Sequence, residues 1–405
     1  MAVTVDEALS LIFEHVKPKS KQLLPIEMAL GHVLAEEITA THNLPPFDNS
    51  AMDGYAVRAD DAGKSLDCAH TIFAGDKEEI RLQERNCIKI MTGARIPHGC
   101  EAIVPVEDTT ADGDKIMMPE KIRPSQHIRL TGEDIQSGDR LLEKGERLHA
   151  HHITLLASQG ISQVQVYKKP RVALFASGSE LKMHFEQVTD YQLYNTNTPT
   201  IEARCQELGC EVQFIGTAVD SLESIHELIE SALDSDLIIT SGGVSVGDAD
   251  YTKEAFAAFD YTNIFEKIEI KPGKPTTFGR IGNTYVLNLP GNPLAAALIF
   301  EIFGQSTINA LSAVKEKYLG TLKAALKGSY KARPGRNTLV PGLYDGESFE
   351  VCQKYAPGMV SPLAKANALI FVDAGVSELE EGHPVKIIPT RFSFNSAQPK
   401  SLFTK

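Results

Sequence analysis

A glycine-rich loop in the middle of the chain has the residue types of a phosphate-binding site. Residues 237–247 read LIITSGGVSVG, a buried-strand pattern that runs directly into the loop. Glycine lets backbone N–H groups approach a ligand closely, and concave sets of such donors favour phosphate. Because the loop follows a predicted strand, it falls where open α/β sheets bind ligands. A tight structural connection would use the same residues, so the loop alone leaves both interpretations open.

A segment of lysines and prolines, residues 271–275 (KPGKP), offers a second anion site. Its two ammonium groups lie on a stretch that the prolines stiffen, so they are partly pre-positioned. The whole chain carries 40 basic and 53 acidic residues, a net charge of −13. An anionic ligand therefore needs a local basic site, and the same balance argues against sequence-independent binding of nucleic acid. A solvated loop is the alternative interpretation.

Two further segments are typical of turns. Residues 289–293 (LPGNP) join a predicted strand to a helix expected over 293–303, with Asn292 as its cap and Pro293 as its first residue. The beginning of that helix can bind an anion, although a well-capped helix explains the same residues equally well. Asp53-Gly54 is a plausible hairpin turn at the opening of a region rich in short strands.

The pattern of elements that would position these segments predicts a multidomain α/β protein. Residues 45–136 contain short alternating strands separated by Gly, Pro and Asp turns, which indicates a small β-rich domain. Between residues 170 and 318 strands alternate with helices, and the helix expected over 221–233 has one apolar stripe. Such alternation predicts a doubly wound, mostly parallel sheet. The strands expected after residue 319 fit a C-terminal β-barrel.

Hydropathy and cysteine usage predict a cytoplasmic protein. No apolar run approaches the roughly 20 residues that a membrane helix needs, and the first ten residues lack a basic leader. The six cysteines are dispersed and form no Cys-x-x-Cys pair, which is typical of free structural thiols. We therefore expect no membrane partner.

Five segments, in this order, resemble the MoeA and gephyrin E-domain family. They are residues 48–56 (DNSAMDGYA), 91–94 (MTGA), 241–253 (SGGVSVGDADYTK), 271–275 (KPGKP) and 289–293 (LPGNP). The C-terminal region resembles the family more weakly, through residues 333–336 (RPGR). The resemblance implies an elongated linker and dimerisation domain (1–44 and 137–169), the small β-rich domain (45–136), an α/β molybdopterin-binding domain (170–318) and the C-terminal β-barrel (319–405).

The resemblance implies a molybdenumtransferase of molybdenum cofactor biosynthesis, which inserts molybdate into adenylylated molybdopterin and releases AMP. The implied cofactor is Mg²⁺, since hard oxygen ligands suit this ion and it can neutralise a pyrophosphate. The implied partners are a second copy, in a homodimer, and the adenylyltransferase that precedes this step. Two other functions stay open: a non-catalytic scaffold of the kind that the gephyrin E domain also serves, and a molybdopterin adenylyltransferase.

The resemblance also assigns residues to the site. Molybdate is expected beside Lys271, Lys274, Pro275, Arg336 and Ser361, whose charged and hydroxyl donors suit an oxyanion. The expected cofactor-binding residues are Ser241, Gly242, Gly243, Ser245, Gly247, Pro290, Gly291 and Asn292. The implied catalytic residues are Asp53, Thr92, Glu180, Asp220 and Asp250, of which Glu180, Asp220 and Asp250 would hold the metal.

Each carboxylate has a structural alternative. Asp53 could simply make its turn. Asp220, with Glu223 three residues on, has the spacing of a helix cap. Glu180 and Asp250 could lie in the first turns of helices, where negative charge is favourable.

The chain also departs from the family's usual sequence at two positions. Ser179 stands where an acidic residue commonly precedes the glutamate, and Asn195 stands where an aspartate is common. Both changes remove negative charge near the proposed metal site, which predicts weaker Mg²⁺ binding or a site with fewer ligands.

Overall fold

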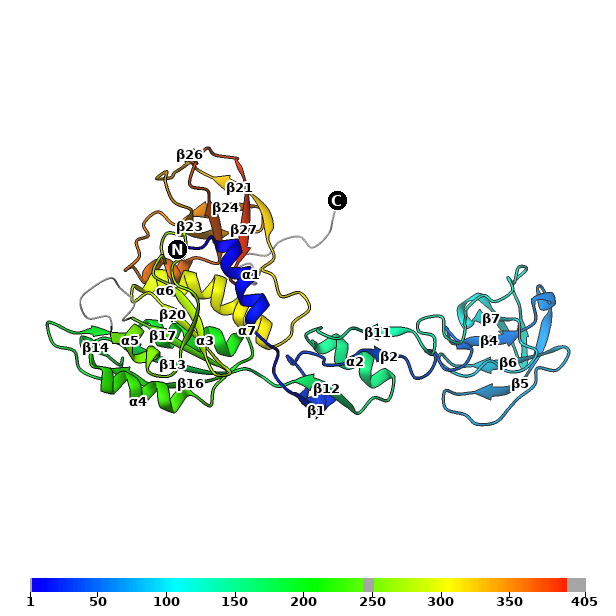
Figure 1. The fold of residues 1–405 in the computed structure, drawn as a ribbon. Helices are drawn as coiled ribbons and strands as arrows, with labels where there is room; N and C mark the ends of the chain where they lie inside the picture. The colour runs from blue at the N-terminus through cyan, green and yellow to red at the C-terminus, as the bar shows by residue number, and fades with distance from the viewer. Residues whose placement is uncertain (1, 243–250, 392–405) are drawn as a thin grey trace.

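The computed structural model describes residues 2–242 and 251–391. The molecule is elongated (Figure 1): the α/β and C-terminal domains lie together at one end, and the small β-rich domain lies at the other. Between them is a linker domain built from two-stranded sheets and two short helices. Its elements are β1 (Lys21–Pro25) paired with β12 (Gln163–Tyr167), β2 (Ile38–Thr39) paired with β11 (Arg140–Leu142), the short helix η1 (Ile26–Met28), and α2 (Ala150–Ser158).

The α/β domain contains a six-stranded sheet in the order β16-β13-β17-β20-β19-β18. Its parallel strands are β16 (Glu211–Ala218), β13 (Arg171–Ser177), β17 (Leu237–Ser241) and β20 (Thr284–Leu289). An antiparallel edge follows, made of β19 (Thr277–Ile281) and β18 (Thr262–Phe265). The predicted doubly wound, mostly parallel sheet is confirmed.

Helices cover both faces of this sheet because its strands alternate their apolar side chains. Leu174 of β13 packs toward α3 (Asn197–Glu207) on one face, whereas Phe175 packs toward α4 (Leu222–Ala232) on the other. α5 (Tyr251–Ala257) joins α4, and α1 (Val5–His15) joins the α3 face, where Ala8 and Ile12 are buried.

The helix predicted over 293–303 is longer than expected and runs from Pro293 to Leu311. It consists of α6 (Pro293–Ile299), a π-helical turn (Phe300–Gly304) and α7 (Gln305–Leu311). Gly304 does not end it, because a Cβ there would lie 2.4 Å from the Phe300 ring, so glycine serves packing inside the helix. Its 19 residues are long and apolar enough to cross a membrane by length and composition, contrary to the sequence prediction. Since 89% of its most apolar stretch is buried, the helix belongs to the domain core.

The small β-rich domain holds a second six-stranded sheet, in the order β7-β4-β6-β5-β9-β8. Its strands are β4 (Gly54–Val57), β5 (Ser65–Ile72), β6 (Asn86–Ile90), β7 (Ala102–Pro105), β8 (Thr110–Asp112) and β9 (Lys115–Met117), with β3 (Asn49–Ser50) and β10 (Ile128–Arg129) beside it. The hairpin predicted at Asp53-Gly54 is wrong, since β4 pairs with β6 and β7. Glycine is required at 54 because a Cβ would lie 2.2 Å from the carbonyl oxygen of Val104.

The C-terminal domain is a closed five-stranded barrel, as predicted. Its strands are β21 (Leu322–Lys327), β24 (Ser348–Val351), β23 (Thr338–Tyr344), β25 (Ala368–Val372) and β27 (Pro384–Pro389). A short pair, β22 (Tyr330–Lys331) with β26 (Glu378–Leu379), and the helix α8 (Ser361–Lys365) complete it. Because α8 packs on both β23 and α6, the barrel is joined to the α/β domain close to where α6 begins.

Candidate active site

A cleft of about 800 Å³ opens at the carboxyl ends of β13, β17 and β20. Open α/β sheets bind ligands at this edge, and a volume of this size suits an organic ligand. The pair formed by β14 (Leu181–Lys182) and β15 (Leu193–Tyr194) forms one side. The lining residues are Ser177, Gly178, Glu180, Leu181, Leu193, Tyr194, Asn195, Thr196, Asn197, Asp220, Ser241, Gly242, Gly291, Asn292, Pro293, Gly358 and Val360.

The floor of this cleft is formed by Ser241, Gly242 and Gly291. The buried side chain of Asn197, at the start of α3, bonds to two of these residues. Its amide nitrogen donates to the hydroxyl of Ser241 (2.6 Å) and to the carbonyl oxygen of Gly291 (2.7 Å). Gly242 has a φ of +99°, and a Cβ there would lie 2.4 Å from the carbonyl oxygen of Ser177. The close approach of the strand ends therefore requires glycine at 242. Three of the predicted cofactor-binding residues thus lie together on the floor.

Two predicted catalytic carboxylates, Glu180 and Asp220, line one wall of the cleft. Ser179 holds Asp220 in place, because its backbone N–H (3.2 Å) and its hydroxyl (2.9 Å) both donate to Oδ2 of Asp220. The cap of α4 is instead Ser221, whose hydroxyl accepts from the N–H of Ser224 (3.3 Å). The capping interpretation of Asp220 is therefore wrong. The helical interpretation of Glu180 is also wrong, since Glu180 directly precedes β14.

The oxygen donors of this wall fit Mg²⁺ only in part. Within residues 2–242 and 251–391, no group of three or more His, Cys, Asp or Glu side chains is arranged to hold a metal ion. The third predicted ligand, Asp250, lies outside the described residues, as do Gly243, Ser245 and Gly247. Mg²⁺ usually keeps several waters and binds one or two carboxylates together with substrate phosphates. Glu180 and Asp220 therefore fit a site that a phosphate ligand completes.

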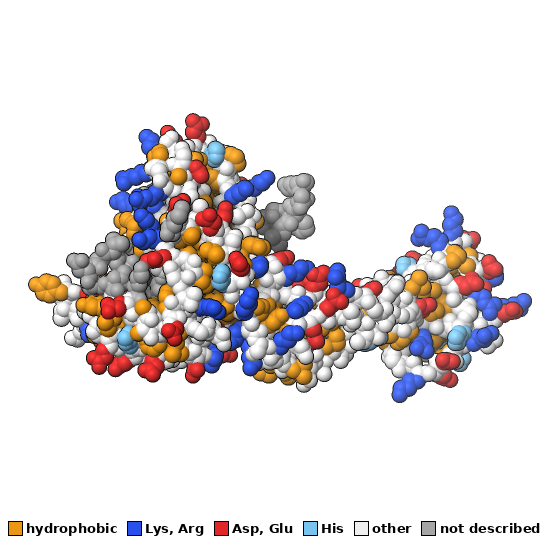
Figure 2. Space-filling view, in the orientation of Figure 1, with side chains coloured by type: hydrophobic (Ala, Val, Ile, Leu, Met, Phe, Trp, Pro, Cys, Tyr) orange, Lys and Arg blue, Asp and Glu red, His pale blue; other side chains and the backbone are white. Residues whose placement is uncertain are grey.

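The lysine segment 271–275 is bonded directly to the C-terminal domain. Lys271 donates its backbone N–H to the carbonyl oxygen of Asn337 (2.8 Å), and its own carbonyl oxygen accepts from Leu339 (2.8 Å). Arg336, the neighbour of Asn337 in the chain, is thereby brought next to the lysine segment. On the visible face, Lys and Arg side chains gather along one side of the C-terminal domain (Figure 2). The side chains of Lys271, Lys274, Arg336 and Ser361 are exposed, and Pro275 is half-buried.

Residues 357–360 of the C-terminal domain lie beside the cleft. The N–H of Leu294, in the first turn of α6, donates to the carbonyl oxygen of Pro357 (2.9 Å). The residues that follow Pro357, among them Gly358 and Val360, line the cleft just before Ser361 begins α8. The residues predicted to bind molybdate come from two domains. The lysine segment and α8, which begins at Ser361, both contact α6, and Arg336 lies next to the lysine segment.

Asp53 and Thr92 form a hydrogen-bonded pair in the small β-rich domain. The backbone N–H of Thr92 (2.7 Å) and its hydroxyl (2.8 Å) both donate to Oδ1 of Asp53. These bonds hold the pKa of Asp53 below its usual value, because they stabilise the ionised carboxylate. This domain and the α/β domain, whose strand ends line the cleft, lie at opposite ends of the molecule (Figure 1). A single chain therefore does not bring Asp53 and Thr92 together with Glu180 and Asp220.

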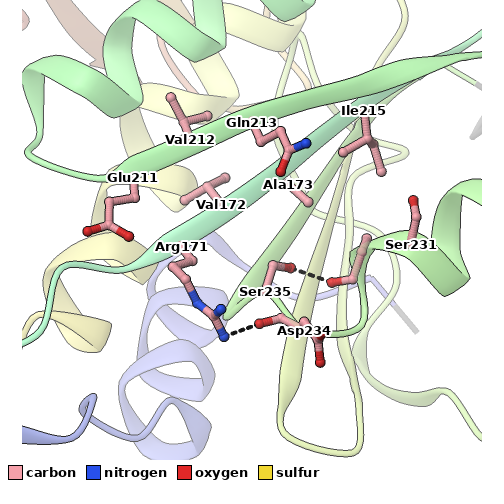
Figure 3. A pocket seen from close by; sticks show the side chains of 11 residues that line it. Arg171, Val172, Ala173, Glu211, Val212, Gln213, Ile215, Ser231, Asp234 and Ser235 are labelled. Carbon is pink, nitrogen blue, oxygen red and sulfur yellow. Dashed lines mark hydrogen bonds between the residues drawn. The ribbon is translucent and has the colours of Figure 1, made fainter.

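A second hollow, of about 270 Å³, lies at the opposite end of the same α/β sheet (Figure 3). It is lined by residues of β13 and β16 near their amino ends and by residues at and just after the end of α4. The Arg171 guanidinium donates to the carbonyl oxygen of Asp234, and the Ser235 hydroxyl donates to that of Ala232 (2.7 Å). Because this hollow lies at the amino ends of the parallel strands, we assign the ligand site to the larger cleft.

Tyr194 and Asn197 are among the cleft residues that were not predicted as site residues from the sequence. Tyr194 lines the cleft wall, and Asn197 bonds to the floor. A signal was present in residues 193–197 (LYNTN), where an aromatic and three polar side chains directly precede a predicted helix. Polar residues between a strand and a helix at the carboxyl edge of a parallel sheet are candidates for ligand binding.

The fold and the cleft define an α/β ligand-binding protein that carries additional β domains. Residues 173–310 match the family described as a probable molybdopterin binding domain. Residues 3–160 match the MoeA N-terminal region (domain I and II), and residues 323–390 match the MoeA C-terminal region (domain IV). All three matches fall in the order that the sequence motifs predicted.

Curated relatives narrow this class to one family. The chain is 35% identical over 398 residues to the molybdopterin molybdenumtransferase of Haemophilus influenzae, covering 96% of this chain and 98% of that protein. It is 33% identical over 404 residues to the protein of the same name from Staphylococcus epidermidis, covering 96% of each. The chain belongs to the molybdopterin molybdenumtransferase (MoeA) family, a family of transferases that act in molybdenum cofactor biosynthesis.

Solved structures agree with this assignment. A MoeA protein from Pyrococcus horikoshii has a TM-score of 0.83 at 27% identity, over 96% of this chain and 99% of that one. A second structure from that organism has a TM-score of 0.82 at 29% identity, over 97% and 100% of the two chains. The resemblance inferred from the five motifs is confirmed.

Proposed function

We propose that the chain inserts molybdate into adenylylated molybdopterin, with release of AMP, at a site that two copies of the chain build together. The observation that carries this proposal is the cleft itself, which has a polar floor, an acidic wall and a side lined by Gly358 and Val360 of the C-terminal domain. The same domain carries Arg336 and is bonded to the lysine segment. The floor suits the phosphate end of a pterin, and the cations suit an oxyanion.

Three groups of residues bind the pterin, molybdate and Mg²⁺, according to their chemistry. Ser241, Gly242 and Gly291 on the floor, with Asn292 at the start of α6, hold the phosphate end of the pterin. Lys271, Lys274 and Arg336 donate charge-assisted hydrogen bonds to molybdate, which is a substrate here, with Pro275 and Ser361 beside them. Glu180 and Asp220, together with Asp250, would hold Mg²⁺, which when bound neutralises the charge of the pyrophosphate.

A homodimer accounts for the position of Asp53 and Thr92. With two-fold symmetry, the small β-rich domain of each copy can reach the cleft of the other, and both sites are then complete. The linker domain offers a surface for such contact, since Leu23, Met28 and Leu30 are large apolar side chains that stay exposed. Large exposed apolar side chains are candidates for protein contacts.

The proposed substrate places this step after that of an adenylyltransferase, which must attach AMP to molybdopterin and which we propose as a partner. We place both reactions in the cytoplasm, because the six cysteines (Cys68, Cys87, Cys100, Cys205, Cys210 and Cys352) are free thiols. Free thiols are the usual state in a reducing compartment.

The test measures AMP released from adenylylated molybdopterin in the presence of Mg²⁺, with and without molybdate. We expect release that depends on molybdate, and release that is the same without molybdate would overturn the proposal. Lys274→Ala should raise the molybdate concentration for half-maximal rate at least tenfold, because a charge-assisted bond contributes about 1.5–3 kcal/mol, while pterin binding stays unchanged. Lys267→Ala, at an exposed lysine seven residues away, is the matched control and should leave both unchanged.

A further inference from the structure

Two cysteines meet at the carboxyl end of α3, where the chain turns into β16. The end of this helix has the hydrogen bonds of a Schellman motif, in which the N–H of Gly209 donates to the carbonyl oxygen of Gln206 and the N–H of Cys210 donates to that of Cys205, each at 2.9 Å. Gly209 has a φ of +84°, the left-handed conformation that this motif requires. The motif commonly brings the side chains at its two ends into contact, which here are Cys205 and Cys210.

The two thiols are close enough to form a disulfide bond. A side-chain hydrogen bond joins them. The backbone bond between the two residues and standard bond lengths keep their Cα atoms within about 7 Å, the distance beyond which a disulfide does not form. The thiols differ in exposure, since Cys205 is fully buried and Cys210 is half-buried. The hydrogen bond with Cys210 and burial raise the pKa of Cys205, so this side chain stays protonated and Cys210 is the thiol that an oxidant meets first.

Cys210 lies in basic surroundings at the junction between the α/β domain and the linker domain. The Arg147 guanidinium, which donates to a backbone carbonyl of the linker domain (2.9 Å), interacts electrostatically with Cys210. It also lies against the turn, since a Cβ built on Gly209 would be 3.6 Å from its Nη1. Beside them is a small hollow of about 10 Å³, room for one water-sized molecule, which Lys168 and Lys169 also line. Reactive cysteines lie in partly exposed, electropositive places of this kind.

We propose that Cys205 and Cys210 form a reversible dithiol–disulfide site that reacts with hydrogen peroxide. The Cys210 thiolate attacks one peroxide oxygen, so an S–O bond forms, the O–O bond breaks, and the second oxygen leaves as hydroxide and takes a proton to become water. The Cys205 sulfur then attacks the sulfenic sulfur of Cys210. The S–S bond forms, the S–O bond breaks, and the hydroxyl group leaves as water with the proton of Cys205. Two electrons pass from the sulfurs to the peroxide, and a dithiol reductant reverses the change.

The pair protects Cys210 from irreversible oxidation. A sulfenic acid without a neighbouring thiol is oxidised further to a sulfinic acid, which dithiols do not reduce. Cys205 prevents this step because its thiol already contacts Cys210. Disulfides in a reducing compartment are usually transient, so free thiols in the resting protein agree with such a site. The site is independent of the proposed function, because neither thiol lines the cleft.

A second pair of cysteines, Cys68 and Cys87, provides an internal comparison. These residues lie opposite each other on β5 and β6, where Cys68 is exposed and Cys87 is buried. Burial and the neighbouring Cys68 raise the pKa of Cys87 to about 12, and the nearby charge of Asp67 adds to this shift. A negative charge opposes thiolate formation, whereas the guanidinium beside Cys210 favours it. We therefore expect the pair at the end of α3 to be oxidised first.

Peptide mapping after brief treatment with hydrogen peroxide tests the site in the full-length protein. Free thiols are blocked with N-ethylmaleimide, and the unreduced protein is cleaved after Glu207, which lies between the two cysteines, so only a disulfide keeps their peptides together. We expect joined peptides that dithiothreitol separates, and mixed heavy and light chains should show that the bond lies within one chain. Four outcomes would overturn the proposal: a bond only between copies, a Cys68–Cys87 bond while Cys205 and Cys210 stay reduced, sulfinic acid at Cys210 in place of the bond, or no oxidation of either thiol.

Substitutions separate the roles of the two thiols and of the guanidinium. In Cys205→Ala, peroxide should produce a sulfenic acid at Cys210 that dimedone captures, followed by a sulfinic acid that dithiothreitol does not reverse. Cys205→Ser repeats this test with a different side chain, and circular dichroism checks that both variants keep the native fold. The matched control is Cys352→Ala, at another half-buried cysteine, which should leave the disulfide unchanged. Arg147→Met should slow the oxidation about tenfold, and Arg147→Lys should restore most of the rate. Reversible oxidation in Cys205→Ala, or an unchanged rate in Arg147→Met, would contradict the proposal.

Discussion

Mixing two inactive variants tests the two-copy site by counting. Asp53→Ala removes a carboxylate from the small β-rich domain, and Lys274→Ala removes an ammonium group from the lysine segment. Each variant alone forms dimers in which both sites carry one lesion. In a mixed dimer, two-fold symmetry puts both lesions into one site and leaves the other wild type. Random exchange makes about half of the dimers mixed, so about a quarter of wild-type activity should return.

The expected quarter of wild-type activity requires that Asp53 and Lys274 of one chain belong to different sites. Figure 1 supports this, because the small β-rich domain and the α/β domain of one chain lie far apart. If each chain built its own site, every site in the mixture would carry a lesion. The assay is molybdate-dependent release of AMP at constant total protein, with the exchange of mass-tagged chains followed by native mass spectrometry. Asp53→Ala mixed with Asp53→Asn is the control, because both lesions lie in the same domain and no site is repaired. No recovery despite confirmed exchange would refute the shared site.

Three other substitutions test single interactions. Thr92→Val removes the hydroxyl bond to Asp53, so the pKa of Asp53 should rise toward its usual value. The acid side of the pH–rate profile should then move to higher pH, and an unmoved profile would exclude an ionised Asp53 from the reaction. Gly242→Ala should abolish pterin binding, measured by calorimetry, while circular dichroism stays native, because a Cβ there meets a backbone carbonyl at 2.4 Å. Arg204→Met should lower the free energy of unfolding by about 3 kcal/mol, since it leaves the buried Glu301 without its bidentate partner (2.7 and 2.8 Å). Burial raises the pKa of Glu301, so the native state holds its proton more tightly and denaturant titrations should show the loss shrink as pH falls.

The fold could be predicted from the sequence wherever a local pattern determined an element. The alternation of strands and helices between residues 170 and 318, with the single apolar stripe of α4, predicted the doubly wound sheet. The prediction failed where contact with a neighbouring side chain or strand decided the outcome. The predicted helix stopped before Gly304, but this glycine lies inside the helix and leaves room for the Phe300 ring. Asp53-Gly54 is typical of a turn in sequence, but Gly54 leaves room for the backbone of a neighbouring strand.

The site could be predicted only as separate segments. Motifs predicted Ser241 and Gly291, and the family resemblance implied Asp220, but no spacing in the sequence says that Asn197 bonds to Ser241 and Gly291 across 44 and 94 positions. The Ser179 bond to Asp220 spans 41 positions and is likewise a product of the sheet. Tertiary structure fixes such partners, so a search for local motifs does not find them.

The two departures from the family's usual sequence now have a physical reading. Ser179 donates two hydrogen bonds to Asp220, so a neutral residue fixes a carboxylate that a neighbouring acid would repel. Asn195 is buried, donates to the hydroxyl of Thr198 (2.8 Å) and accepts from its N–H (3.2 Å), so a neutral amide opens α3 without placing a charge in the interior. The orientation of Asp220 therefore does not depend on a bound cation. We expect Mg²⁺ to bind weakly to the free protein and to arrive with the pyrophosphate that completes its ligands.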